Sequence, residues 1–122
     1  MEIAQTRHQT LLVLTNLPDE ASAHALAAAL VTERLAACVN VLAPCRSVYR
    51  WQGAIENATE TPLLIKTTAV RYAALEVAIR ARHPYELPEI IAVPIAHGLP
   101  AYLDWVAAET LTERADEKPL SC

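Results

Sequence analysis

The sequence contains no phenylalanine and only two glycines, Gly53 and Gly98. Because turns and flexible loops use glycine most freely, we do not expect long flexible loops. Eight prolines interrupt the chain instead. Hydrophobic residues still make up 53% of the 122 residues, much of them alanine, and this is enough for one packed core. We therefore expect a single domain over residues 1–122, with an ordered core at about 10–112 and a polar tail at each end.

The charge and the apolar runs exclude two classes of partner. The net charge is −4, from ten Lys and Arg against fourteen Asp and Glu, and no basic block occurs, so we expect no nucleic acid partner. No apolar run reaches the ~18 residues that span a bilayer. Residues 1–10 are polar and lack the apolar region of a signal peptide. These features predict a soluble, cytoplasmic protein that does not associate with a membrane.

Cysteine usage and motif content exclude several kinds of site. The three cysteines, Cys38, Cys45 and Cys122, are an odd number without a CxxC spacing, which favours reduced thiols over a disulfide scaffold or a zinc site. The GxSxG, Walker and GxGxxG patterns are all missing, so the sequence has neither a nucleophile elbow nor a phosphate loop. We therefore expect no enzymatic activity and no organic cofactor.

The apolar pattern alternates between strand and helix periods. It predicts strands at 10–15, 35–42, 47–51, 54–67 and 89–95, and helices at 20–34, from residue 68 to the proline at 84, and from residue 100 onward. Asp19 and Thr68 are placed to cap the first two helices, and Pro100 suits the first turn of the third, whose apolar side includes Tyr102 and Trp105. The order β-α-β-β-α-β with a C-terminal helix predicts an α+β, ferredoxin-like fold, with both main helices on one face of an antiparallel sheet.

Residues 38–67 form an unusually long predicted hairpin, with a tight turn at Gln52 and Gly53. Its arms of ~13 and ~15 residues span on the order of 43–50 Å, against a radius of gyration of roughly 14 Å for a chain of this length. The hairpin should overhang its domain or bend. Tyr49, Trp51 and Ile55 lie near its tip, and exposed edges with such residues favour pairing between subunits of a homo-oligomer. A bent hairpin within a monomer is the alternative.

Residues 83–89 (HPYELPE) carry the densest chemistry of the chain, and the two prolines restrict their backbone. His83, Glu86 and Glu89 are suitable ligands for a borderline metal ion such as Cu(II) or Zn(II), and the two glutamates also suit acid–base catalysis. Alternatively, His83 and the prolines end the helix, and Tyr85 fills a seam between subunits.

Lys66 and Tyr85 are candidate ligand-binding residues. Lys66 closes an otherwise apolar strand, where its ammonium either meets an anionic ligand or remains in solvent. Tyr85, Tyr102 and Trp105 either line a small-ligand pocket or belong to the core or an interface.

Five motifs together are similar to one known family: LAACVNV at 35–41, SVYRWQGAIE at 47–56, LIKT at 64–67, HPYELPE at 83–89 and YLDW at 102–105. They resemble the CutA family of divalent-cation tolerance proteins over about residues 11–110. The resemblance implies a ferredoxin-like subunit, a tight homotrimer and a likeness to PII-type signalling proteins.

The resemblance also implies tolerance of copper and other divalent metals, and Cu(II) binding in some members. Carried over by position, His83 and Glu89 belong to the metal-binding region. Some members add a cysteine where this chain has Thr15. Because a thiolate is the strongest soft-metal ligand of such a set, its replacement argues against tight copper binding.

The sequence thus leads to one main hypothesis and one alternative. The main hypothesis is a trimeric, non-enzymatic protein of divalent metal tolerance that binds an ion weakly through His83 and Glu89, with Glu86. The alternative is a PII-like signalling module that binds a small anionic ligand near Lys66 and Tyr85 in clefts between subunits.

Overall fold

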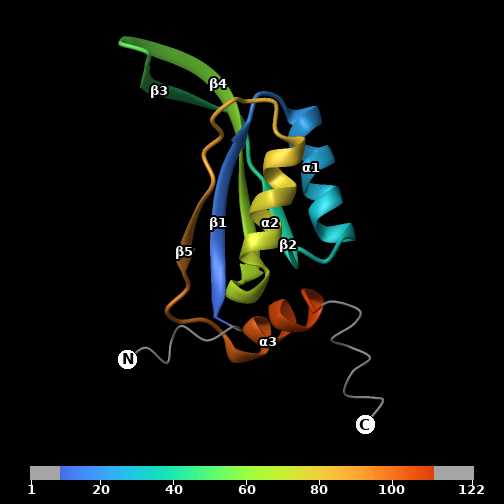
Figure 1. Cartoon of the computed structure of the whole chain (residues 1–122). Coiled ribbons are helices and arrows are strands. Elements are labelled where there is room, and N and C mark those ends of the chain that lie inside the picture. The colour runs from blue at the N-terminus through green and yellow to red at the C-terminus, as the bar shows by residue number, and fades with distance from the viewer. Residues whose placement is uncertain (1–8, 112–122) are drawn as a thin grey trace.

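The computed structural model describes residues 9–111 (Figure 1). The elements are β1 (Thr10–Leu17), α1 (Glu20–Thr32), β2 (Cys38–Val41), β3 (Cys45–Trp51), β4 (Ala54–Thr68), α2 (Ala69–Arg82), β5 (Ile91–Pro94) and α3 (Pro100–Glu109). The strands pair antiparallel in the order β2-β4-β1-β5, and β3 pairs with the first half of β4. This topology confirms the α+β, ferredoxin-like prediction.

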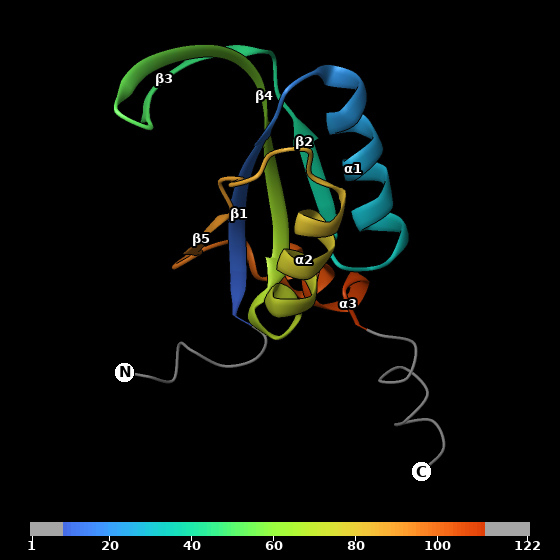
Figure 2. The ribbon, with the colours of Figure 1, turned by 45° about the horizontal axis from the view of Figure 1, so that its top comes forward.

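The molecule has two layers. Helices α1 and α2 lie on the same face of the sheet, and α3 lies at the end of the sheet away from the hairpin (Figures 1 and 2). Side chains alternate along β1 and β4, so Val13 and its partner Ile65 point toward the helices. The core of buried residues is Val13, Leu17, Ala23, Leu26, Leu30, Leu35, Ala36, Leu63, Ile65, Leu75 and Ile79. Predicted helix positions such as Leu75 and Ile79 are therefore confirmed as core.

Helix α1 begins as expected from its cap. The Asp19 carboxylate accepts a hydrogen bond of 2.8 Å from the Ser22 backbone N–H, and this bond lowers the pKa of Asp19. The helix ends at Thr32, two residues before the predicted end. Arg34 then adopts a left-handed backbone with φ of 60°, so the helix does not continue to residue 34.

Helix α2 begins at the predicted place but without the predicted cap bond. Thr68 is the N-cap residue, yet its hydroxyl is buried and has no hydrogen-bond partner in the described part of the chain. The helix ends at Arg82, and His83 is extended with φ of −85° and ψ of 134°. The following Pro84 disfavours the helical conformation at His83, in agreement with its extended backbone.

The sequence predicts that the long hairpin overhangs its domain or bends, and the structure shows both. Its first arm is divided into β2 and β3 by residues 42–44, which include Pro44, while β4 is continuous over its 15 residues. The part of β4 that pairs with β3 projects beyond the sheet and curves over (Figures 1 and 2). At the tip, Gln52 and Gly53 have φ of 50° and 84°, as a two-residue turn with two positive φ angles requires. The bent hairpin positions the pocket described below.

The C-terminal region departs from the prediction in two ways. Strand β5 has four residues, fewer than the predicted seven, and the register ends at Pro94 opposite Leu11. In α3, Pro100 occupies the first turn as predicted, but Val106 is the one buried residue of this helix. Tyr102 and Trp105 are exposed in the single chain, with ring centres 5.5 Å apart. They therefore do not belong to the core of the subunit.

Candidate ligand pocket beneath the hairpin

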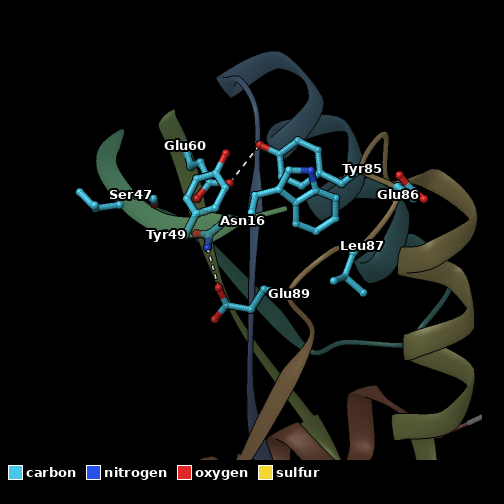
Figure 3. A pocket seen from close by; sticks show the side chains of 10 residues that line it. Asn16, Ser47, Tyr49, Glu60, Tyr85, Glu86, Leu87 and Glu89 are labelled. Carbon is cyan, nitrogen blue, oxygen red and sulfur yellow. Dashed lines mark hydrogen bonds between the residues drawn. The ribbon is translucent and has the colours of Figure 1, made fainter. Parts of the chain in front are cut away.

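A pocket of about 690 Å³ lies between the hairpin and residues 83–89 (Figure 3). Its lining residues are Asn16, Ser47, Val48, Tyr49, Trp51, Glu60, Tyr85, Glu86, Leu87 and Glu89. They come from the end of β1, from β3 and β4, and from the segment between α2 and β5. The volume is typical of a site for a small molecule. Three of the lining residues are glutamates and none is a lysine, arginine or histidine, so the pocket is acidic.

His83 anchors the segment that forms one wall of the pocket. Its Nδ1 accepts a hydrogen bond of 3.2 Å from the Tyr85 backbone N–H, and its Nε2 lies 2.7 Å from the Asn16 carbonyl oxygen. Because Nδ1 accepts, Nε2 carries the hydrogen and donates it to Asn16, so the ring is neutral. The imidazole is buried and contacts the Tyr85 ring, with centres 4.7 Å apart. Both ring nitrogens are therefore used within the chain.

Tyr85 and Glu60 form the most enclosed polar pair of the pocket. The Tyr85 hydroxyl donates a hydrogen bond of 3.0 Å to Glu60 Oε2 (Figure 3). Burial, followed by this hydrogen bond and the charge of Glu60, raises the pKa of Tyr85 to about 12. The phenol thus stays protonated and serves as a hydrogen-bond donor over the whole neutral range.

The three predicted metal ligands lie near one another in sequence but do not converge in space. Glu89 Oε1 accepts a hydrogen bond of 2.9 Å from Asn16 Nδ2, whereas the carboxylates of Glu86 and Glu89 point to opposite sides of the pocket (Figure 3). Within residues 9–111, no three His, Cys, Asp or Glu side chains are grouped as a metal site. The assignment of His83, Glu86 and Glu89 as metal ligands stays a prediction.

Lys66 and Tyr85, the two predicted ligand-binding residues, are not brought together within one chain. The Lys66 ammonium donates to Asn40 Oδ1 on β2 and lies 4.0 Å from the Cys38 sulfur. Along β4 it is six residues from Glu60, which corresponds to about 20 Å. Lys66 therefore contributes no positive charge to this pocket, and a shared anion site in a cleft between subunits stays a prediction.

The three residues predicted at the trimer interface divide between two faces of the hairpin. Across the hairpin, Trp51 pairs with Ala54, Tyr49 with Glu56 and Cys45 with Glu60. Paired residues lie on the same face, and Cys45, Tyr49 and Trp51 are an even number of residues apart along β3. The side chains of Tyr49 and Trp51 therefore lie on the same face of the hairpin as Glu60. Ile55 pairs with Arg50 and lies on the opposite face. Tyr49 and Trp51 thus line the pocket, while Ile55 points away from it and is exposed.

The sheet face opposite α1 and α2 carries an apolar surface that is partly exposed in the single chain. Leu12 and Leu14 of β1 point to this face, with Leu64 of β4 and with Ile91 and Val93 of β5 as cross-strand neighbours. Ile91 and Val93 are 51% and 48% exposed. We call these five residues the open sheet face. Exposure of large side chains on this scale is typical of a surface that meets another protein.

The same arrangement of elements occurs in known proteins. A family model described as CutA1 divalent ion tolerance protein matches residues 11–109. The chain belongs to the CutA1 family. The divalent-cation tolerance protein CutA of Thermus thermophilus is 48% identical over 99 residues, which cover 81% of this chain and 96% of that relative.

Solved CutA structures share the fold over nearly their whole length. The crystal structure of CutA from Xylella fastidiosa is 48% identical with a TM-score of 0.82, and the match covers 84% of this chain and 99% of that one. The structure from Archaeoglobus fulgidus, named as a periplasmic divalent cation tolerance protein, is 34% identical with a TM-score of 0.81 and the same coverage. In the present chain, none of the described helices is long and apolar enough to cross a membrane. The cytoplasmic location stays a prediction.

Five of the lining residues were not among the sequence candidates, and they include the polar residues Glu60 and Asn16. Glu60 lies within the predicted strand 54–67, and Asn16 directly follows the predicted strand 10–15. The alternation of side chains along β4 could have identified Glu60. It lies an even number of residues from the candidate Lys66, so both side chains are on the same face of the strand. The same alternation along β1 places Asn16 on that face too.

Proposed function

We propose that this CutA1 family member acts in tolerance of divalent cations as a homotrimer, catalyses no reaction, and binds a divalent ion such as Cu(II) weakly. Family membership supports the role in tolerance. The observation that carries the metal-binding part is the acidic pocket, because Glu60, Glu86 and Glu89 line it without a basic side chain among its lining residues. Carboxylates attract divalent ions, and an imidazole beside them suits Cu(II).

Weak binding follows from the hydrogen bonds that the proposed ligands already make. His83 has to release either Tyr85 or Asn16, and Glu89 has to release Asn16. Glu86 has to turn toward the other two. Each of these changes costs free energy that reduces the affinity for the ion. Thr15 supplies no thiolate to offset the cost.

The homotrimer is supported by the open sheet face and by the hairpin. Both present apolar side chains to solvent in the single chain, including Ile91 and Val93 on the sheet and Ile55 on the hairpin. Within residues 9–111, strand β5 pairs only with β1, and an unpaired edge of this kind invites pairing with another chain. Association of subunits covers these surfaces.

The absence of catalysis is supported by the side chains near the pocket. The hydroxyl of Ser47 is 4.0 Å from the sulfur of Cys45, which is no general base. His83 has both nitrogens engaged, so it is not poised to activate a nucleophile. The free thiols of Cys38 and Cys45 suit a reducing compartment, so we also propose a cytoplasmic location.

Calorimetric titration of the metal-free full chain with Cu(II) tests the metal-binding part, with Cys45 and Cys122 blocked in every sample. We expect saturable binding of about one ion per chain, weakened in His83→Ala and in Glu89→Gln. His24→Ala is the matched control, because His24 is an exposed histidine on α1 and should leave binding unchanged. Cu(II) binding that is undetectable, or that is equal in the wild type and in both pocket variants, would overturn the proposed site.

A further inference from the structure

Glu60 is the most enclosed carboxylate of the pocket, with 8% of its surface exposed. Its hydrogen-bond partner is the neutral hydroxyl of Tyr85, 3.0 Å away. Within residues 9–111 no basic side chain forms an ion pair with it. Removing a carboxylate from water without a counter-charge is costly, so a buried carboxylate normally has a cation beside it. Residues 9–111 supply no such cation, and the open side of the pocket is where one can enter.

The walls around Glu60 are aromatic. Tyr49 and Trp51 lie on the same face of the hairpin as Glu60, and Tyr85 reaches Glu60 from the opposite wall. Figure 3 shows the Tyr85 hydroxyl directed at the Glu60 carboxylate, and the Tyr49 ring overlaps Glu60 in this view. Aromatic faces attract cations, and the attraction is strongest for tryptophan and for cations that carry little bound water.

We infer that this pocket binds an organic ammonium ion, with its positive nitrogen beside Glu60 and its apolar groups against Trp51 and Tyr49. A bare metal ion uses the carboxylates and leaves the aromatic walls without a partner. An anion is repelled by the three glutamates. A volume of about 690 Å³ holds a molecule far larger than a hydrated metal ion. The inference goes beyond the proposed metal tolerance and does not depend on it.

A matched pair of probes tests the role of charge. Choline is a small quaternary ammonium ion. Its uncharged analogue 3,3-dimethylbutan-1-ol, called dimethylbutanol below, has the same shape with a carbon atom in place of the charged nitrogen. In calorimetric titration of the full chain, we expect choline to bind saturably at about one molecule per chain. The alcohol should bind at least about tenfold more weakly, since it gains neither the Glu60 attraction nor the cation–π attraction.

Two variants test which residues hold the cation. Glu60→Gln removes the charge with little change in shape, and Trp51→Leu removes the aromatic face. Each should weaken choline binding roughly two- to thirtyfold. Glu76→Gln on α2 and Trp105→Leu on α3 make the same chemical changes outside the pocket and should leave choline binding unchanged. Circular dichroism of all four variants checks that the fold is retained.

Equal binding of choline and dimethylbutanol, or undetectable binding of choline by the wild type, would overturn the inference without any variant. Choline binding that survives both Glu60→Gln and Trp51→Leu would overturn the assignment to this pocket. The metal proposal fails separately, because Trp51→Leu removes no metal ligand and should leave the Cu(II) titration unchanged. If Trp51→Leu loses choline binding and retains Cu(II) binding, this result supports the inference independently of the metal proposal.

Discussion

His83 Nε2 lies 2.7 Å from the carbonyl oxygen of Asn16, and this bond joins the end of α2 to the end of β1 across 67 residues of sequence. On the other side of the ring, Nδ1 accepts from the Tyr85 backbone N–H. One neutral imidazole therefore sets the path of the segment that carries Tyr85 and Glu89 to the pocket. A ring nitrogen of His83 cannot bind a metal ion while it makes its hydrogen bond to Asn16 or to Tyr85.

Replacing His83 with alanine should lower the free energy of unfolding by about 2 kcal/mol, because two partly buried hydrogen bonds are lost and the Asn16 carbonyl and Tyr85 N–H lose these partners. Urea denaturation at a fixed chain concentration measures this change. The exposed His24 on α1 is the control, and His24→Ala should change stability by no more than about 0.5 kcal/mol. Equal stability of His83→Ala and wild type would show that the ring is not an anchor.

Tyr85 should titrate later than a free tyrosine, with a pKa of about 12 against 10.0. Because the folded state holds the phenolic proton more tightly than the unfolded state, this group's contribution to stability is complete below pH 10 and is lost as the pH rises toward 12. Absorbance titration of the phenolates measures the pKa, and Tyr85→Phe identifies the late component. Glu60→Gln should lower the pKa only in part, since burial is its largest cause. A wild-type titration without a late component would contradict the assignment.

The fold was predictable because local signals and periodicity agree. The Asp19 cap, Pro100 at the first turn of α3, and the turn at Gln52 and Gly53 are each specified by one or two residues. The strand pattern of residues 54–67 correctly predicted a long second arm, and the hairpin both projects beyond the sheet and bends. Element ends were less predictable, since Arg34 and the short β5 depend on tertiary contacts and not on their own sequence.

The pocket was predictable only in part, because its residues come from four separate elements. Tyr85, Glu86 and Glu89 lie in one proline-bounded segment, so composition alone identified them. Glu60 and Asn16 become site residues only when the hairpin curves over the end of β1, although the period of two along each strand already places them on one face. The open sheet face was missed for a related reason, since an apolar run such as residues 10–15 predicts burial on both faces.

Gly53→Ala should lower the free energy of unfolding by about 1 kcal/mol. Gly53 has φ of 84°, a left-handed conformation that is unfavourable for a residue with a Cβ. A Cβ there would meet no atom within 4 Å, so the cost comes from the backbone alone. Gly53→Asn should cost less, because asparagine tolerates this conformation better. Denaturation of both variants measures the difference, and an alanine variant as stable as the asparagine variant would refute the backbone explanation.

Val93→Lys should dissociate the proposed homotrimer while leaving the subunit folded. Val93 lies on the open sheet face beside Leu12 and is 48% exposed in the single chain, so a lysine there is accommodated in a monomer. At a subunit interface the same lysine would bury an unpaired charge, which costs several kcal/mol in each subunit.

Val77→Lys on α2 is the control, because Val77 is 68% exposed on the helical side of the molecule. Light scattering at equal chain concentrations should give a trimer mass for wild type and Val77→Lys and a monomer mass for Val93→Lys. A trimer in both variants would place the interface elsewhere, and a monomeric wild type would refute the trimer itself.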